Sequence, residues 1–508
     1  MIDFNEILLK INRHGFQYVK PYNTDKAYDL IKKHLSGNII IRGDWDVDGG
    51  LSAKIIHNYF RDNNYDANVF FGTKKTHGVE NEDVEYCKNN KVNLYIIVDS
   101  SSNSIDALKQ IISNGTDVLI IDHHVTEISY DEYEKENILI INSKMKYNEI
   151  IQNISAGFLC YLVTSYWRDK KSVGINKEDL ILGYITLISD NCKTDDPYIQ
   201  DIIFNIDDLR EKYTPYEVCL FFDKYSRLNR NWLNFKFDNI LNNAFRLNKI
   251  HYIEGLLFGE DEKTKEISKE GLVLEYKLTK EKRQTLIAEH LQDICKNYYG
   301  VIFVDLNKAL QYTDLPKDYL LNSTGLFASN VSDVTNKPAI AYISQDTETL
   351  KCSGRDTRNN FPFQDILKQY ELDGGGHYAA IGFKMPILEL NELFNIGKRF
   401  ADKINQRNTT IKIVNYNDLI QSDFNFNDLI KVIAYNNEIA HSELKPIQIK
   451  FNLKEADKIQ EYNKMVSYYF GDYQVKDLLK KYSNDDTVLA QPDFSDNNTL
   501  IIQAKSVD

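Results

Sequence analysis

The chain has 508 residues, of which 43% are hydrophobic and 27% are charged, and its formal net charge is −13. These proportions predict a globular protein of roughly two to four domains and exclude a disordered or fibrous chain. No window approaches the roughly 18 uninterrupted apolar residues of a membrane span, and the first residues lack the basic and apolar parts of a signal peptide, so we expect a cytoplasmic protein.

The six cysteines lie far apart and form no C-x-x-C pair. This spacing argues against a zinc ribbon or a disulfide framework and is typical of a reducing compartment. The abundance of Asn, Lys, Ile and Tyr, with only nine prolines, indicates an AT-rich bacterial or viral genome. The acidic charge argues against a general DNA-coating protein but does not exclude a nuclease, whose active site needs carboxylates.

Residues 38–200 alternate short apolar runs with amphipathic stretches. The apolar runs predict strands at 38–42, 67–71, 94–98, 118–121 and 138–141. Helices are expected at 82–89 and 105–113, and another with Ser52 as its N-cap. Nearly unbroken Val, Ile and Leu runs separated by helices indicate the α/β class, with a doubly wound parallel sheet covered on both faces.

The remainder of the chain divides into three regions. Residues 201–300 are mostly helical, and the stretch Thr279–Tyr299, which lacks Gly and Pro, is expected to form one connector helix. A smaller α/β pattern follows, with strands at 301–306, 339–344, 350–353 and 380–384. The last hundred residues mix strand-like runs, such as 410–414 and 447–451, with helical ones, which predicts an α+β region. The expected domains are therefore 1–200, 201–300, 301–400 and 401–508.

Polar residues follow directly on three strands of the predicted parallel sheet. They are Asp44, Asp46 and Asp48 after the first, Asp99 after the third, and Asp122, His123 and His124 after the fourth. In doubly wound folds, ligands bind beyond the carboxyl ends of the strands. We therefore expect these side chains to converge on one edge of the sheet.

The segment from Gly43 to Gly50 carries three carboxylates in five residues. They repel one another unless a cation neutralises them, so a divalent metal is their natural partner. An EF-hand loop also begins D-x-D-x-D-G, but its twelfth position would be Ile55 instead of Glu, and the segment follows a strand. An acidic surface turn without a metal remains the alternative.

Further candidate ligands are weaker signals when taken alone. One His after a strand is more often structural, but a carboxylate beside two imidazoles is rarer, and imidazole suits Mn, Fe or Zn better than Mg. Asp99 and Asp190 end apolar segments and would ordinarily be capping residues. As carboxylates that point toward the same site, each could bridge two cations.

A glycine run closes the second α/β pattern. Gly374, Gly375 and Gly376 precede His377, and Ser353-Gly354-Arg355 lies upstream. Consecutive glycines let a backbone approach a ligand closely, and their N–H groups can cradle a phosphate, although such a run is more often a hinge or turn.

The order D-x-D-x-D-G, strand-Asp, Asp-His-His, a later Asp and G-G-G-H resembles the DHH phosphoesterase superfamily, and within it the RecJ-like single-strand nucleases. The resemblance covers about residues 38–385 and implies a phosphodiesterase with two divalent cations, Mn²⁺ or Mg²⁺. It implies that Asp46 binds one ion, that Asp48 and His123 bind the other, and that Asp99 and Asp190 bridge them.

The resemblance also implies roles for the remaining candidates. Asp44 and Asp122 would orient the ligands, and His124 would contact the scissile phosphate or protonate the leaving oxygen. A DHH-associated domain would grip the phosphates of the substrate through Arg246, Ser353, Arg355, Gly374, Gly375, Gly376 and His377. The region 401–508 would correspond to an oligonucleotide-binding domain.

The sequence departs from the family pattern at three places. Phe245 stands where a Gly usually precedes the Arg equivalent to Arg246, and that segment is one residue shorter. Asp99 is followed by Ser100-Ser101-Ser102 instead of a small residue and a Gly. Arg42 occupies the position of a metal-binding His in some subfamilies, so another ligand or water must complete the first ion.

The resulting hypothesis is a 5′-to-3′ exonuclease that degrades single-stranded DNA to 5′-mononucleotides. Alternatives are an oligoribonuclease or (cyclic) dinucleotide phosphodiesterase, a pyrophosphatase, and a non-catalytic replication scaffold. The expected partner is single-stranded nucleic acid, with DNA favoured and RNA left open, and no membrane. The sequence leaves open the oligomeric state and any helicase or single-strand-binding partner.

Overall fold

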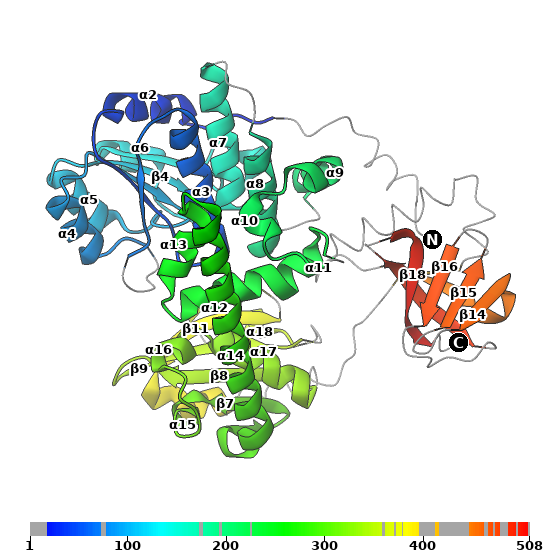
Figure 1. Cartoon of the computed structure of the whole chain (residues 1–508). Coiled ribbons are helices and arrows are strands. Elements are labelled where there is room, and N and C mark those ends of the chain that lie inside the picture. Colours follow the sequence, from blue (N-terminus) through cyan, green and yellow to red (C-terminus); the bar gives the residue numbers. More distant parts are fainter. Residues whose placement is uncertain are drawn as a thin grey trace. The chain divides into compact units, whose positions relative to one another are not determined.

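The computed structural model, drawn in Figure 1, describes most of the chain up to residue 395 and the strands beyond it. The described residues are 18–72, 78–171, 176–192, 196–223, 226–357, 361–369, 372–377, 379–395, 412–415, 447–461, 466–470, 473–477, 486–493 and 496–505. The N-terminal stretch considered for a signal peptide lies outside these residues, as do the first two residues of the predicted strand 410–414.

A five-stranded parallel sheet forms the centre of the N-terminal region, as the alternation of apolar runs and helices predicts. Its strands are β1 (Ile39–Arg42), β2 (Asn68–Phe70), β3 (Leu94–Val98), β4 (Asp117–Asp122) and β5 (Ile138–Asn142). Their order in space is β2-β1-β3-β4-β5, and every neighbouring pair is parallel. Each predicted strand lies within about one residue of the observed one.

Helices cover both faces of this sheet (Figure 1). Successive side chains of a strand point to opposite faces of the sheet, and one face presents Ile40, Tyr95 and Ile120. These side chains pack in one buried cluster with residues of α4 (Asn81–Asn89), α5 (Ile105–Ser113) and α6 (Tyr130–Lys135). The other face packs against α3 (Val47–Asp62) and α7 (Ala156–Lys170). The first helix, α2 (Thr24–His34), and α8 (Lys177–Ser189) complete this region.

Helix α3 begins six residues earlier than the sequence indicates. Its N-cap is Asp46, whose Oδ1 accepts a hydrogen bond from the Gly49 amide at 3.0 Å. Ser52, the predicted cap, lies inside the helix, where its hydroxyl donates to Asp48 Oδ1 at 3.2 Å. The prediction was wrong because Asp caps a helix as well as Ser does, and the glycines after Asp48 conceal the first turn.

The region after α8 is helical, with a π-helical turn in its middle. Its elements are α9 (Pro197–Tyr213), α10 (Tyr216–Cys219), α11 (Arg230–Trp232), the π-helix η2 (Leu233–Phe237), α12 (Asp238–Arg246), α13 (Ile250–Phe258) and α14 (Glu262–Ile294). The connector helix α14 begins earlier and ends sooner than predicted. The last residues expected in this helix instead form the edge strand β6 (Cys295–Tyr298). Tyr298 stacks on Phe394 there, with ring centroids 4.5 Å apart. Tertiary packing therefore overrides the local preference for a helix.

A second sheet of six strands follows in the order β10-β11-β9-β8-β7-β6. The remaining strands are β7 (Val301–Asp305), β8 (Ala339–Ser344), β9 (Thr349–Arg355), β10 (Asp373–His377) and β11 (Ala380–Pro386). Only β7 and β8 pair in parallel. The helices are α15 (Leu306–Ala309), α16 (Lys317–Leu321), α17 (Thr324–Thr335), α18 (Phe363–Gln369) and α19 (Leu390–Phe394). The glycine run lies in the edge strand β10 and not in a hinge or turn.

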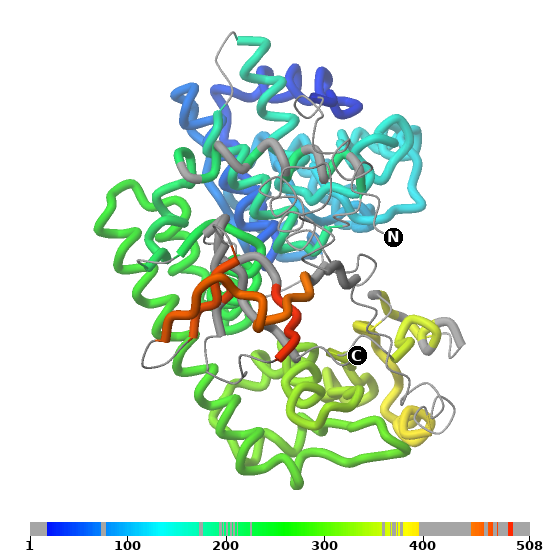
Figure 2. Tube along the Cα trace, turned by 90° about the vertical axis from the view of Figure 1, so that its right-hand side faces the viewer, coloured from blue at the N-terminus to red at the C-terminus, as the bar shows by residue number. Residues whose placement is uncertain are grey.

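The C-terminal region contributes a third sheet, drawn in orange and red in Figure 2. Its strands are β12 (Lys412–Asn415), β13 (Ile447–Asn452), β14 (Lys458–Glu461), β15 (Val466–Phe470), β16 (Tyr473–Asp477), β17 (Thr487–Asp493) and β18 (Asp496–Lys505). Their order is β12-β13-β17-β18-β16-β15-β14. Whether this region binds oligonucleotides stays a prediction.

Tertiary contacts divide the chain into two compact units. The first comprises residues 1–242, 253–269 and 411–508, and the second comprises 243–252 and 270–410. The expected domains 1–200, 201–300, 301–400 and 401–508 stay a prediction. Among the described residues, no helix combines the length and the apolar composition that crossing a membrane requires.

Candidate metal centre

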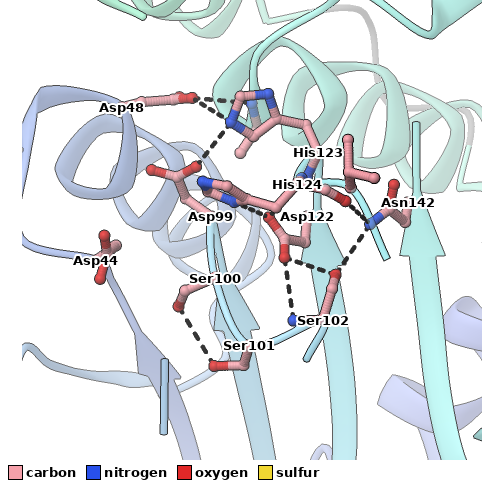
Figure 3. Close-up of polar contacts among 12 residues, drawn as sticks. Asp44, Asp48, Asp99, Ser100, Ser101, Ser102, Asp122, His123, His124 and Asn142 are labelled. Carbon is pink, nitrogen blue, oxygen red and sulfur yellow. Dashed lines mark hydrogen bonds and ion pairs between the residues drawn. The ribbon is translucent and has the colours of Figure 1, made fainter. Parts of the chain in front are cut away.

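The candidate site lies at the point where the strand order of the first sheet reverses. The chain passes from β1 outward to β2, whereas β3 leads to β4 and β5 on the opposite side. Ligands of doubly wound folds bind in the crevice that opens between two such strands, beyond their carboxyl ends. Asp44, Asp46 and Asp48 follow β1, and Asp99 follows β3. Figure 3 shows Asp44, Asp48 and Asp99.

The structure brings the predicted metal ligands into one cluster. In three groups, one donor atom of each residue lies within 4.8 Å of those of the other two. The groups are Asp99, His123 and His124, then Asp48, His123 and Asp190, and finally Asp44, Asp46 and Asp99. Because the groups share His123 and Asp99, they form one continuous set of carboxylate and imidazole donors.

The His123 ring lies at the centre of the cluster. Its Nε2 is 3.2 Å from Asp99 Oδ1 and 3.8 Å from Asp48 Oδ2, and its Nδ1 is 3.6 Å from Asp190 Oδ2. Burial lowers the pKa of His123 against the opposing charge of Asp190. A neutral imidazole has a lone pair available for a metal, so the ring is suited to coordination.

The N-terminus of α7 holds Asp48 in place. The amides of Ala156 and Gly157 donate to its two carboxylate oxygens at 3.0 and 2.8 Å. A Cβ at position 157 would lie 2.5 Å from Thr186, so only glycine lets the two helices approach this closely. Burial raises the pKa of Asp48 well above its usual range, and the charges of Asp190 and Asp46 add to this.

Asp99 occupies a turn with two residues in the left-handed region. Its φ is 63°, and that of Ser101 is 77°, where the family pattern has a Gly. The Ser101 hydroxyl accepts a hydrogen bond from the Val79 amide at 3.0 Å, which helps to hold this turn. Burial raises the pKa of Asp99 well above its usual range, and the nearby carboxylates of Asp48 and Asp46 raise it further. A divalent cation bound here would stabilise the charged form of these carboxylates.

Asp122 orients the turn that carries the two histidines (Figure 3). Its Oδ1 accepts from the amide and from Nδ1 of His124, the latter at 2.8 Å, and its Oδ2 accepts from the Ser102 hydroxyl at 2.6 Å. Burial alone would raise the pKa of Asp122, but the hydrogen bond and the charge of His124 hold it well below its usual range. In turn, the hydrogen bond with Asp122 raises the pKa of His124 to about 9.

Arg42 takes up a structural position beside the cluster. Its guanidinium is almost fully buried, with Nη1 3.4 Å from Asp44 Oδ1 and Nε 3.2 Å from Asp83 Oδ1. Tyr95 also donates to Asp83 Oδ1 at 2.7 Å. Since a guanidinium has no lone pair to offer a metal, Arg42 instead neutralises part of the charge of Asp44.

The sequence reasoning missed one carboxylate of this region, Asp238. It begins α12 directly after the π-helical turn, is 7% exposed, and accepts from the Ser189 hydroxyl at 2.8 Å. Burial raises its pKa to about 7, partly offset by that hydrogen bond, and the charge of Asp46 adds to the rise. The only sequence signal for Asp238 is its position, five residues before Asn243.

The predicted phosphate contacts lie in the second unit. Ser353 and Thr324 form a hydroxyl–hydroxyl hydrogen bond at 2.8 Å. Burial lowers the pKa of Arg355, and the charge of Arg246 lowers it further, so the two cations are near each other. Ala380 pairs with both His377 and Arg355, which places the three in one row across the sheet. The structure thus groups these residues, while their contacts with phosphate stay a prediction, as do those of Gly374, Gly375 and Gly376.

Part of the chain resembles known protein sequences. Residues 38–185 match the DHH family, N-terminal domain. Over 148 residues, the chain is 28% identical to a putative SPbeta prophage-derived single-strand DNA-specific exonuclease, YorK, of Bacillus subtilis (strain 168), and equally to its counterpart in Bacillus phage SPbeta. The match covers 28% of this chain and only 24% of each relative.

The fold is that of RecJ. The crystal structure of RecJ in complex with Mn²⁺ from Thermus thermophilus superposes with a TM-score of 0.67 at 14% sequence identity, and covers 97% of this chain and 72% of that one. The Mg²⁺ complex of the same protein gives a TM-score of 0.62 at 15% identity, over 98% and 71% of the two chains. The chain therefore combines a segment that matches the DHH N-terminal domain with a RecJ-like fold.

Proposed function

We propose that this protein, which carries a DHH family domain and has a RecJ-like fold, is a phosphodiesterase that depends on two divalent cations and degrades single-stranded DNA from the 5′ end to 5′-mononucleotides. The observation that supports this most directly is the convergence of carboxylates and imidazoles from β1, β3, β4 and α8 at the switch point of the sheet. The exonuclease named among its relatives supports the choice of substrate.

The donor set fits Mn²⁺ or Mg²⁺. Carboxylate oxygens suit both ions, and the central imidazole of His123 favours Mn²⁺. Asp46 would hold one ion, Asp48 and His123 the other, and Asp99 and Asp190 both. When bound, such a pair supplies an activated water and neutralises the charge of the phosphodiester.

The protein's own residues position these groups. Asp122 fixes the His124 ring through Nδ1, and the side chain is 56% exposed, so Nε2 is available to contact a phosphate or to donate a proton to the leaving oxygen. Asp44, paired with Arg42, helps to orient the ligands of the first ion. The arginines, Ser353, the glycine run and His377 of the second unit would bind the phosphates of the substrate.

We also propose that the protein acts in the cytoplasm of a bacterial cell, with a viral gene as one source. The related sequence encoded by Bacillus phage SPbeta supports this.

The test is a polarity and length assay with Mn²⁺ and single-stranded DNA labelled at either end, run in parallel on RNA. We expect mononucleotides to be released first from the 5′ end and long DNA to be cut faster than di- to tetranucleotides. Faster cleavage of the short substrates would favour an oligoribonuclease or dinucleotide phosphodiesterase. Phosphate release from pyrophosphate alone would indicate a pyrophosphatase, and no turnover of any substrate would leave a non-catalytic scaffold.

A further inference from the structure

A lysine lies beside the metal centre, in the turn that follows β5. Asn142 ends this strand and pairs with Asp122 at the end of β4. The Ser143 amide donates to the Asp122 carbonyl at 3.2 Å, and the Lys144 amide donates to Asn142 Oδ1 at 2.7 Å. Lys144 is therefore fixed two residues beyond the carboxyl end of β5, as His124 is beyond β4.

The side chain of Asn142 ties this turn to the histidine turn. Its Nδ2 donates to the carbonyl of His124 at 2.9 Å and to the hydroxyl of Ser102 at 2.9 Å (Figure 3). The same hydroxyl donates to Asp122. One hydrogen-bond network thus holds the backbones of His124 and Lys144 side by side, and a movement of one turn would disturb the other.

The ammonium group of Lys144 has an unusual environment. The side chain is half-buried, and its charge contributes to lowering the pKa of His123, for which burial is the main cause. Yet among the residues that the structure describes, none forms a hydrogen bond or an ion pair with its Nζ. A half-buried lysine covers its apolar stem and can keep its ammonium group at the surface, so the Nζ of Lys144 is available to an anionic ligand.

We infer that Lys144 binds a phosphate oxygen of the nucleic-acid substrate at the metal centre. This inference rests on the proposed function and adds a residue that lies outside the DHH motif and the glycine run. A lysine ammonium is a compact charge with three donors and binds phosphate without a fixed geometry. Its position on the sheet edge beside the histidine turn brings it to the phosphate that His124 would contact.

The chain offers a matched control two residues away. Lys146 is exposed and lies over the ring of Tyr147, with Nζ 5.0 Å from the centroid. Substitution of either lysine by Met removes one positive charge and keeps most of the apolar stem, so any effect of net charge alone is common to both variants. The Lys144→Arg variant retains the charge.

The experiment compares wild type, Lys144→Met, Lys144→Arg and Lys146→Met on a single-stranded oligonucleotide with Mn²⁺. We expect Lys144→Met to raise KM by about tenfold and to reduce the slope of log affinity against log salt by about one phosphate contact. Lys144→Arg should restore most of the affinity, and Lys146→Met should match wild type.

Calorimetric titration with Mn²⁺ alone separates this role from a structural one. Removing a positive charge near His123 should leave the affinity for Mn²⁺ equal or tighter, because cations repel one another. Weaker Mn²⁺ binding, or a loss of thermal stability, in Lys144→Met would show a structural role. Unchanged KM with tighter Mn²⁺ binding would show that Lys144 serves only as a counterion of the carboxylates. Either result overturns the inference.

A second probe keeps the inference testable if the protein degrades no nucleic acid. Thymidine 5′-monophosphate can be titrated into the Mn²⁺-loaded protein, and we expect weaker binding to Lys144→Met than to wild type or Lys146→Met. A wild type that binds this nucleotide but cuts no DNA contradicts the proposed function alone. Equal binding to all variants, or no binding to any, contradicts the inference.

Discussion

At the scale of single residues, the candidate site holds several carboxylates close together. Asp48 and Asp99 are buried beside each other and beside Asp46, and burial raises the pKa of each. The N-terminus of α7 holds the Asp48 carboxylate, and a left-handed turn fixes the backbone of Asp99, so the carboxylates have little room to move apart. Folding here stores repulsion that a bound cation would release.

Asp99→Asn tests this repulsion directly. Asn is isosteric and tolerates the left-handed backbone of position 99, so the variant removes charge with little strain. In EDTA we expect a melting temperature about 2–4 °C above wild type, which corresponds to roughly 1 kcal/mol. With Mn²⁺ the order should reverse, because the variant loses a ligand. Thermal melts in both buffers provide the check, and a variant less stable than wild type in EDTA would contradict the account.

His57, on α3, makes the folded protein sensitive to acid. Its ring lies edge-on to the ring of Phe258, with the ring centroids 5.3 Å apart. The buried Nδ1 has no hydrogen-bond partner among the described residues. Burial and the charges of Lys54 and Arg61 lower the pKa of His57 to about 4, although the charge of Asp62 opposes this shift. A lowered folded pKa means that stability present above the unfolded value, about 6.5, is lost as the pH falls toward 4.

The substitution His57→Phe removes this proton site and retains an aromatic contact. Relative to wild type, the variant should gain about 2 kcal/mol in the free energy of unfolding as the pH falls from about 7.5 to about 5. Urea unfolding at the two pH values measures the change. A constant difference between the two proteins would show that His57 titrates normally in the folded state.

At the scale of elements, the same residues serve the fold and the site. Asp46 caps α3 through the Gly49 amide and is also a candidate ligand, and α3 in turn presents Asp48 in its first turn. The helix therefore begins where the metal centre begins. This dual use explains why the acidic segment adopts a defined structure although its charges repel.

The two roles of Asp46 can be separated by substitution. Asp46→Ser keeps an N-cap acceptor and removes the carboxylate, whereas Asp46→Ala removes both. In EDTA, we expect the Ala variant to be about 1 kcal/mol less stable than the Ser variant, while neither retains wild-type affinity for Mn²⁺. Urea unfolding and Mn²⁺ titration measure the two effects, and equal stability of both variants would show that the cap contributes nothing.

The sequence predicted the elements whose patterns are local. The strands of the parallel sheet are apolar runs with clear ends, and the polar residues after them follow from the direction of a parallel sheet. Features that depend on residues far away in the sequence could not be predicted. Residues 295–298 became a strand because β7 and Phe394 lie beside them, and Asp238 reached Ser189 from a helix far along the chain.

At the scale of the whole molecule, the proposed function requires a chain of net charge −13 to bind an anionic polymer. Bound cations would resolve this conflict, because they would reverse the sign of the field at the candidate metal centre. Binding of single-stranded DNA should therefore depend on metal even when no cleavage occurs.

This dependence can be measured with a cleavage-resistant phosphorothioate oligonucleotide. By fluorescence anisotropy at moderate salt, we expect affinity in EDTA to be at least about tenfold below that with Mn²⁺, and affinity with Mn²⁺ to fall as salt rises. Equal affinity with and without the ion would place the binding surface away from the carboxylate cluster.

The most direct measurement is an anomalous difference map from crystals grown with Mn²⁺. The account predicts two peaks, one contacted by Asp46 and the other by Asp48 and His123, with Asp99 and Asp190 contacting both. A map without peaks at these carboxylates, or with manganese bound only elsewhere on the protein, would contradict it.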